Sequence, residues 1–351
     1  MALSKIQGID GQVTPNLGRR NVIINGAMEI AQRGTSDTGK TGSGISTVDR
    51  MALGIDNLGT WTVTQESLTS GAAYNAGFKK AFRIDCTTAD ASPASSDNIF
   101  FQYKLEGQDL KTFRKGTSSA KQFTLQFWVK SNKTGTGQVL LQDKDNNRYV
   151  GKTYTISSAN TWEQKILTFP ADTTGAFDND NNKSLEIEWA LDAGSDFTSG
   201  TLPATWTTGS NTQRSVNDFA LGDSTDNDWA ITGIQLEAGD TATDFEHLSY
   251  GEELSLCQRY FYKYINTGLS DQYNFRSPYT PAQVSAGLPN SSAICPMTFP
   301  VTMRAAPTMA TTINTGTLNR QTSTPFGFVA QMGSTSNGTA YITQYLAAAE
   351  L

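Results

Sequence analysis

The sequence predicts an all-β protein, an antiparallel jelly-roll sandwich followed by a small C-terminal β-rich domain. Only 17% of the 351 residues are charged, and Thr, Ser, Asn and Gly fill the spaces between apolar residues, which suits short strands and turns. In many segments apolar and polar residues alternate with the period of two that is typical of a half-buried strand. Long amphipathic helical patterns are nearly absent.

Length and composition divide the chain into three segments, because 351 residues exceed the usual single domain. Residues 1–20 carry few apolar side chains and end in Arg19 and Arg20. They are predicted to form an N-terminal attachment arm that orders only against a partner. Residues 21–250 are expected to form the jelly roll. Residues 251–351, rich in Tyr, Ser, Thr and Pro, are expected to form the β-rich tip and oligomerisation domain.

The first elements of the sandwich are a strand expected at residues 21–25, a helical piece at 27–33 and a flexible loop at 34–46. Further along, the odd-numbered residues from Phe123 to Val129 are all apolar, whereas Gln126 and Trp128 belong to the opposite face. This pattern indicates a half-buried antiparallel strand. The same alternation predicts strands at residues 60–66, 81–87, 98–105, 137–142, 149–156, 162–169, 185–191 and 229–236.

Residues 231–262 join the sandwich to the C-terminal segment. Ile231, Ile234 and Leu236 indicate a last core strand, and residues 245–248 are expected to begin another. Glu252 and Glu253 then open a short helix, since carboxylates suit the positive end of the helix dipole. Later strands are predicted at 259–265, 293–299, 307–313, 326–331 and 340–346. So few strands make a marginal core, which an oligomer could complete.

Two sequence blocks resemble a junction found in tail-fibre and minor structural proteins of bacteriophages. One is NVIINGAMEIAQRG at residues 21–34, followed by Thr-Val-Asp-Arg at 47–50, and the other is residues 231–262. The resemblance implies a virion protein made in the bacterial cytoplasm, commonly a homotrimer, which contacts other virion proteins through its N-terminal arm.

Residues 25–29 and the closing strand also resemble jelly rolls of carbohydrate-binding modules. In that family a glutamate at the position of Glu29 and acids on the closing strand hold a structural calcium. Here Thr232 and Gly233 occupy the positions where acids are expected. We therefore assign no metal and no cofactor.

Charge and cysteine content exclude several classes of function. The net charge is -6 and the longest basic clusters are pairs, so binding of nucleic acid through phosphates is not expected. No stretch approaches the roughly 20 apolar residues of a membrane span, so membrane insertion is not expected either. Cys86, Cys257 and Cys295 are odd in number and widely spaced, which argues against a disulfide framework. His247 and Cys257 could pair, but nothing supplies a third orienting group.

Three motifs suggest a chemical function but also have a simpler structural explanation. Residues 34–41 match the phosphate-loop pattern, but the expected strand and helix do not flank them. The acidic-amide runs at residues 143–147 and 178–182 could bind calcium, but hairpin turns explain them more simply. Paired carboxylates for glycoside hydrolysis could come from Glu163, Glu186, Glu188 or Asp228, although solvated strand acids are much commoner. We therefore do not expect this protein to be an enzyme.

Exposed aromatic rings next to amides would suit sugar binding, because they bury much area with little loss of entropy. Trp61, Trp162 and Trp229 head predicted strands and are expected in the core. The glycan-binding candidates are Trp128 with Gln126, Trp206 in the polar loop 201–210, and the cluster Tyr273, Arg276 and Tyr279.

The sequence thus favours a bacteriophage tail fibre that binds host surface polysaccharide. The first alternative is a head fibre, decoration protein or other virion part without its own ligand. The second is a surface-polysaccharide depolymerase.

Overall fold

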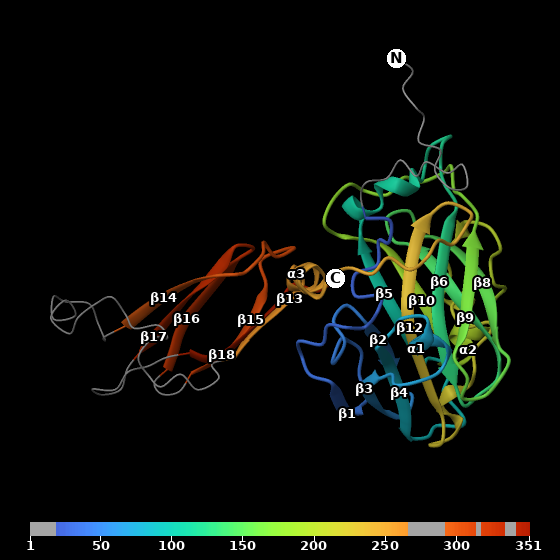
Figure 1. Cartoon of the computed structure of the whole chain (residues 1–351), viewed down its shortest axis with the longest axis horizontal. Helices are drawn as coiled ribbons and strands as arrows, with labels where there is room; N and C mark the ends of the chain where they lie inside the picture. Colours follow the sequence, from blue (N-terminus) through green and yellow to red (C-terminus); the bar gives the residue numbers. More distant parts are fainter. Residues whose placement is uncertain (1–18, 266–291, 314–316, 334–341) are drawn as a thin grey trace, which may run out of the picture.

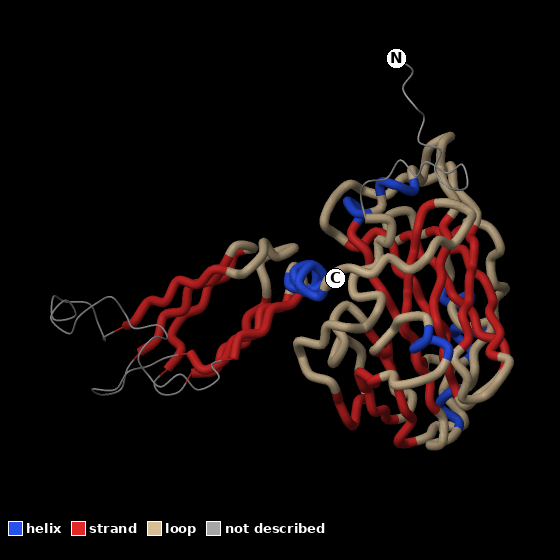
Figure 2. The backbone as a smooth tube through the Cα atoms, in the orientation of Figure 1, coloured by secondary structure: helices blue, strands red, loops and turns tan. Residues whose placement is uncertain are grey.

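The computed structural model describes residues 19–265, 292–313, 317–333 and 342–351. Its strands form two six-stranded sheets that face each other and two three-stranded sheets from the C-terminal part (Figure 1). All pairings between named strands in the described residues are antiparallel. Figure 2 shows how little helix accompanies them. The predicted all-β class is confirmed.

The two large sheets make the sandwich. The first sheet has the order β1 (Ser36–Lys40), β3 (Thr60–Ser67), β4 (Lys80–Thr88), β12 (Asp228–Ala238), β6 (Phe123–Ser131) and β9 (Glu163–Phe169). The second sheet has the order β11 (Thr207–Thr208), β8 (Arg148–Ile156), β7 (Gly135–Asp143), β10 (Lys183–Ala193), β5 (Asn98–Glu106) and β2 (Ala52–Asp56). The chain passes repeatedly from one sheet to the other, as a jelly roll does.

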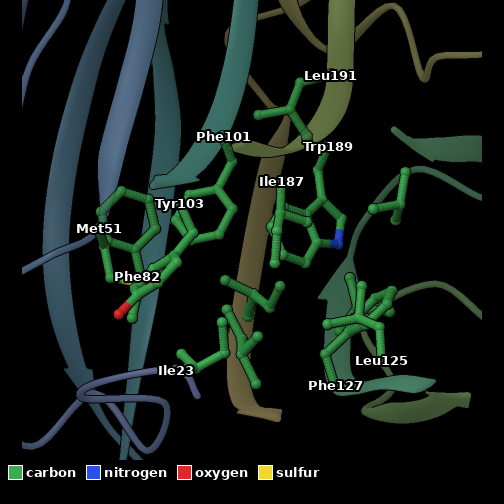
Figure 3. Close-up of a cluster of buried hydrophobic side chains, with 14 of the residues drawn as sticks. Ile23, Met51, Phe82, Phe101, Tyr103, Leu125, Phe127, Ile187, Trp189 and Leu191 are labelled. Atoms are coloured by element: carbon green, nitrogen blue, oxygen red, sulfur yellow. The ribbon is translucent and has the colours of Figure 1, made fainter. Parts of the chain in front are cut away.

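The core lies between these sheets and combines aromatic rings with aliphatic side chains (Figure 3). Phe101 on β5 has its ring centroid 5.0 Å from that of Phe82, 5.2 Å from Trp189 and 5.4 Å from Trp229. Phe82 and Trp229 belong to the first sheet and Trp189 to the second, so these contacts join the two layers. The three tryptophans predicted to head core strands are all buried: Trp61, Trp162 and Trp229.

The segment before β2 differs from the expectation. Residues 21–25 form no strand and residues 27–33 form no helix; both are turns and irregular backbone. Asn25 and Met28 have φ values of 62° and 61°, which neither a strand nor a right-handed helix tolerates. The Asn25 side chain instead bonds both backbone polar groups of Ile30. This segment still joins β12, since the Val22 N–H donates to the carbonyl of Leu236.

The expected loop at residues 34–46 contains β1, which pairs with β3 at the edge of the first sheet. Lys40 ends this antiparallel strand rather than opening a helix, so the phosphate-loop pattern here lacks the geometry that cradles a phosphate. Residues 245–248 form no strand, contrary to the prediction, and cross the outer face of the first sheet.

The helices are short. They are α1 (Ala72–Asn75), α2 (Ser195–Thr198), α3 (Tyr250–Gln258) and the single-turn 3₁₀ helices Gly107–Asp109, Lys111–Phe113, Asn211–Gln213 and Leu221–Asp223. The predicted helix α3 is confirmed, and Ser249 and Glu252 close its first turn as a reciprocal capping box. Among the described residues, no helix has the length and apolar content needed to cross a membrane.

The C-terminal strands form two small sheets that pack on each other. One has the order β13 (Phe261–Ile265), β18 (Ile342–Ala348) and β15 (Thr308–Ile313), and the other β14 (Ser292–Thr298), β17 (Gly327–Gly333) and β16 (Thr317–Thr324). Phe299, Phe328 and Tyr345 lie at the centre of their shared core. The five predicted strands are present, and β16 was not predicted.

Cation and aromatic contacts join the C-terminal strands to the sandwich next to α3. The guanidinium of Arg33 lies 3.6 Å from the ring centre of Phe261, and that of Arg50 lies 3.5 Å from the ring centre of Tyr260. Glu350 then bridges Arg33 and Arg50 with an N–O distance of 2.9 Å to each. The end of the described chain therefore returns to the sandwich (Figure 1).

Replacing Phe101 by Ala is expected to lower the free energy of unfolding by about 3 to 5 kcal/mol, because the cavity would lie between both sheets. Chemical denaturation would measure this change. Phe326→Ala is the control, since that ring is 69% exposed and its loss should change stability by about 0.5 kcal/mol or less. Equal effects would contradict the assigned core.

Asp49 should make stability depend on pH. Burial raises the pKa of Asp49 to about 7, against hydrogen bonds from Gln32 and the charge of Arg33. The folded state therefore holds this proton more tightly than the unfolded state, so stability is lost as pH rises from about 4 to 7. Asp49→Asn should remove that loss, at up to about 1.4 kcal/mol per pH unit. Denaturation of both proteins at several pH values tests this, and a pH-independent difference would contradict it.

Candidate functional site

A groove with a volume of about 500 Å³ lies on the outer face of the first sheet. Its floor comes from β6 and β9, and its walls come from residues 76–78 and from the crossing segment 242–247. The side chains that shape it are Gln126, Trp128, Gln164, Ile166, Phe245 and His247.

The floor follows from strand periodicity. Gln126 pairs with Ile166 and Trp128 pairs with Gln164 across β6 and β9. Because side chains alternate along a strand, these four project to the same outer face while Phe127 enters the core. Gln126 is buried and Trp128 is half-buried, whereas Gln164 and Ile166 are exposed. The groove therefore has an aromatic and aliphatic floor with amides beside it.

A chain of hydrogen bonds fixes the polar side of the groove. Gln164 Nε2 donates to Gln126 Oε1 at 3.1 Å, and Gln126 Nε2 donates to the carbonyl of Thr243 at 2.6 Å. Glu237 accepts from the backbone N–H and the hydroxyl of Thr243, each at 2.8 Å. The crossing segment is thus attached to β6 and β12 by side chains rather than by strand pairing.

The aromatic wall depends on a glycine in β12. The ring centroids of Phe78 and Phe245 are 4.9 Å apart, and those of Phe245 and His247 are 4.7 Å apart. Gly233 has φ 63°, and a Cβ at this position would lie 2.6 Å from Cζ of Phe78. Thr232 donates to the carbonyl of Lys80 at 2.7 Å. Of the two residues at the positions expected to hold calcium-binding acids, Gly233 therefore makes room for this wall, while Thr232 joins β12 to Lys80.

The groove carries little charge. Its lining includes the carboxylate of Asp244 and the imidazole of His247, with no Lys or Arg. A smaller hollow of about 160 Å³ shares Phe245 and His247 with the groove and is lined by Glu29 and Glu253. Burial raises the pKa of Glu253. This environment disfavours anionic ligands and suits neutral polar ones.

Metal and thiol chemistry find no support in the described ranges. They contain no group of three or more His, Cys, Asp or Glu side chains placed to hold a metal ion. Cys257 is buried beside Ile24, Ile30 and Tyr260, whereas His247 is exposed and stacks near Phe78 and Phe245. The hypothetical Cys-His pair is therefore not formed.

The predicted glycan-binding residues have different outcomes. Trp128 and Gln126 lie together in the groove, on the face that the alternation predicted. The prediction that Trp206 lies away from any core is wrong: it is 7% exposed, packs 5.6 Å from Phe123 and donates from Nε1 to the carbonyl of Pro170. It seals the end of the sandwich, so it offers no free ring face. Tyr273, Arg276 and Tyr279 lie outside the described residues.

Arg19 and Arg20 contact the protein's own chain. The backbone N–H groups of Arg20 and Asn21 both donate to Glu246 at 2.8 Å, and the Arg20 side chain donates to the carbonyl of Asp244. Arg19 Nε donates to the carbonyl of Asn21 at 2.6 Å. Their predicted role in attachment stays a prediction.

The strand carboxylates are paired, and three of them, Glu186, Glu188 and Asp228, are buried rather than solvated as expected. Glu188 is fully buried and receives two hydrogen bonds from Arg214, at 2.9 and 2.6 Å. Glu186 is also buried and pairs with Lys144 and Lys183. Glu163 pairs with Lys165, and Asp228 pairs with Arg83. The sequence gives no sign of the Arg214 loop that covers Glu188.

The acidic-amide runs form turns, as the simpler explanation predicted. Asp143 Oδ1 accepts from the backbone N–H groups of Asp145 and Asn146, and Asp180 Oδ1 accepts from that of Asn182.

Groove residues that the sequence did not indicate include Phe245, Gln164 and Ile166. The register between β6 and β9 would have indicated Gln164 and Ile166, because it places them opposite Trp128 and Gln126.

The sequence matches no protein-family model, and no curated protein matches it significantly. Solved structures with partial similarity include the enzymatically active domain of tailspike protein 4 from bacteriophage CBA120, at 13% identity and a TM-score of 0.31, over 62% of this chain and 21% of that one. A family 4 carbohydrate-binding module matches at 10% identity and a TM-score of 0.31, over 61% of this chain and 97% of that one.

A family 11 carbohydrate-binding module from Clostridium thermocellum, in complex with a mixed-linked tetrasaccharide, matches at 10% identity and a TM-score of 0.27, over 59% of this chain and 98% of that one. At these TM-scores and identities, none of the three matches informs what this chain binds.

Gln126→Leu should loosen the crossing segment, because it removes the donor to the carbonyl of Thr243 while keeping similar volume. Hydrogen exchange should become faster at the amides of Thr243 and Glu246, with global stability little changed. Thr136→Val, at an exposed position of β7, is the control and should leave these amides unchanged. Unaltered exchange in Gln126→Leu would mean that Gln235 and Glu237 hold the segment without Gln126.

Proposed function

We propose that this chain is a non-enzymatic glycan-binding virion protein, a bacteriophage tail fibre whose groove binds a neutral polysaccharide of the host surface. The observation that carries the proposal is the strand pair β6–β9. It presents the ring of Trp128 and the amides of Gln126 and Gln164 to one open groove.

The chemistry of the groove supports a sugar. A pyranose has apolar C–H faces and a rim of hydroxyl groups, so it needs a flat apolar surface flanked by donors and acceptors. Trp128 and Ile166 supply the apolar surface. Gln164, the backbone of the crossing segment and Asp244 supply the donors and acceptors. The floor stands on strands of a packed sandwich, which lowers the entropy lost on binding.

The same lining argues against a depolymerase acting in this groove. Glycoside hydrolysis usually employs two carboxyl groups across the scissile bond. The groove lining offers one carboxylate, that of Asp244. The four strand acids considered as candidates are engaged in ion pairs elsewhere: Glu163, Glu186, Glu188 and Asp228.

The virion assignment rests on the two sequence blocks at residues 21–50 and 231–262. A homotrimer is supported by exposed apolar side chains on the C-terminal hairpin β16–β17, namely Leu318, Phe326 and Val329. Several equivalent grooves on one particle would multiply weak sugar contacts. A purely structural virion protein is the second candidate, since its interfaces would bury the same apolar residues.

Trp128→Ala should weaken glycan binding about tenfold or more, because it removes the aromatic ring that β6 contributes to the floor. Wild type and variant would be compared on an array of host surface polysaccharides, with circular dichroism to confirm folding. Phe326→Ala is the matched control, since it removes an exposed ring from the C-terminal hairpin.

The possible outcomes separate the candidates. Loss of binding in Trp128→Ala with normal binding in Phe326→Ala supports the groove. The reverse pattern places recognition in the C-terminal part and overturns the groove. Wild-type protein that binds no host polysaccharide favours the structural role, and released oligosaccharides would show a depolymerase.

A further inference from the structure

At one end of the sandwich, Lys115 is enclosed with two aspartates away from the groove. The side chains of Lys115 and Asp143 are both 0% exposed, with Nζ of Lys115 2.5 Å from Oδ2 of Asp143. A second carboxylate, Asp172, has its Oδ2 3.1 Å from the same Nζ. Burying a primary amine against two carboxyl groups is costly unless hydrogen bonds satisfy the remaining donors and lone pairs.

The three residues come from different parts of the sandwich. Lys115 lies in the turn between the 3₁₀ helix Lys111–Phe113 and β6, and Asp172 follows β9, which is also in the first sheet. Asp143 ends β7 in the second sheet. A bond between Lys115 and Asp143 would therefore connect the two sheets.

Aromatic rings flank the cluster. Nζ of Lys115 lies 5.0 Å from the ring centre of Trp206 and 5.1 Å from that of Phe177. The carbonyls of Gly175 and Thr174 accept from Nζ at 2.6 and 3.3 Å, which fixes the amine in place.

The two oxygens of Asp143 have different surroundings. Oδ2 faces the amine, whereas Oδ1 accepts from the backbone N–H groups of Asp145 and Asn146, both at 3.0 Å. The side-chain amide of Asn146 lies between the two oxygens, 3.2 Å from Oδ1 and 3.0 Å from Oδ2. The two backbone N–H donors on Oδ1 stabilise negative charge that develops there when the carbonyl carbon is attacked.

Asp172 is placed to move a proton. Arg148 donates to both of its oxygens, at 2.8 and 3.1 Å, which holds the carboxylate toward Lys115. Burial alone would raise the pKa of Asp172, but the hydrogen bonds from Arg148, Thr174 and Lys115 hold it below its usual value. Asp172 is therefore ionised, and its Oδ2, 3.1 Å from Nζ, is the proton acceptor nearest to the amine after Asp143.

We propose that Lys115 and Asp143 condense spontaneously in the folded protein to an isopeptide bond. One proton passes from the Lys115 ammonium to Oδ2 of Asp143, which leaves a neutral amine and a neutral carboxyl group. The Nζ lone pair attacks Cγ, forming the C–N bond and placing negative charge on Oδ1. Asp172 takes a second proton from Nζ and gives it to Oδ2, which leaves as water while the Cγ–Oδ1 double bond re-forms.

The atoms balance without an oxidant or cofactor, since one ammonium and one carboxylate become one amide and one water. Fixed contact between the two groups supplies the high effective concentration that such a condensation needs. The product would tie the turn before β6 to the end of β7.

Intact mass spectrometry of the purified full-length chain tests the proposal. We expect a mass lower than the sequence mass by one water, and a branched peptide that joins the segments containing Lys115 and Asp143 after proteolysis. Folded protein with the full sequence mass would overturn the proposal, because Lys115 and Asp143 would then remain an ion pair without a covalent bond. A lost water found in a linear peptide would also overturn it, because an aspartate can cyclise with its own backbone.

Three variants sharpen the test. Lys115→Met should restore the full mass, since it lacks the nucleophile. Asp143→Asn should lose one ammonia instead of one water, because the leaving group is changed. Asp172→Asn should keep the full mass or condense much more slowly while remaining folded. A lost water that persists in Lys115→Met would contradict the assignment, and the wild-type result decides the matter even if that variant does not fold.

Discussion

The packing of aromatic rings between two antiparallel sheets is the constraint on which the other features depend. Phe101 contacts rings from both layers, so the inner faces of β4, β5, β10 and β12 must stay in register with each other. Strand alternation then decides every outer face as well. Because Phe127 enters this core, its neighbours Gln126 and Trp128 must point outward. The packing of the core therefore determines which side chains form the floor of the groove.

The outer faces of the two large sheets differ. Residues 194–224 cover the second sheet, where Arg214 pairs with Glu188, Phe197 packs on Phe100 and the Gly222 N–H donates to Asp192. The first sheet is crossed only partly by residues 242–247, so space remains over β6 and β9. The second sheet is thus covered on its outer face, and the open groove lies on the first.

Alternation of residues such as Phe123 to Val129 made most of the sandwich predictable, because a period of two depends on local sequence alone. The groove was half predictable. Trp128 and Gln126 follow from that alternation, but Gln164 and Ile166 needed the register between β6 and β9. The burial of Trp206 was not predictable because its loop folds back onto the core. The irregular backbone of residues 21–33 was not predictable because Asn25 and Met28 adopt positive φ angles. Such long-range or conformational facts leave no periodic signal in the sequence.

The bridge from Glu350 to Arg33 and Arg50 sets how the two halves of the molecule share mechanical load. The bridge adds to the ion pair between Arg259 and Glu106 and to the hydrogen bonds between Arg304 and Asn181, which also connect the C-terminal part to the sandwich beside the covalent path at α3. With two guanidinium groups stacked on Phe261 and Tyr260 and clamped by one carboxylate, the connection resists twisting as well as stretching. A torque applied at the far hairpin is therefore passed to the strand scaffold that carries the groove.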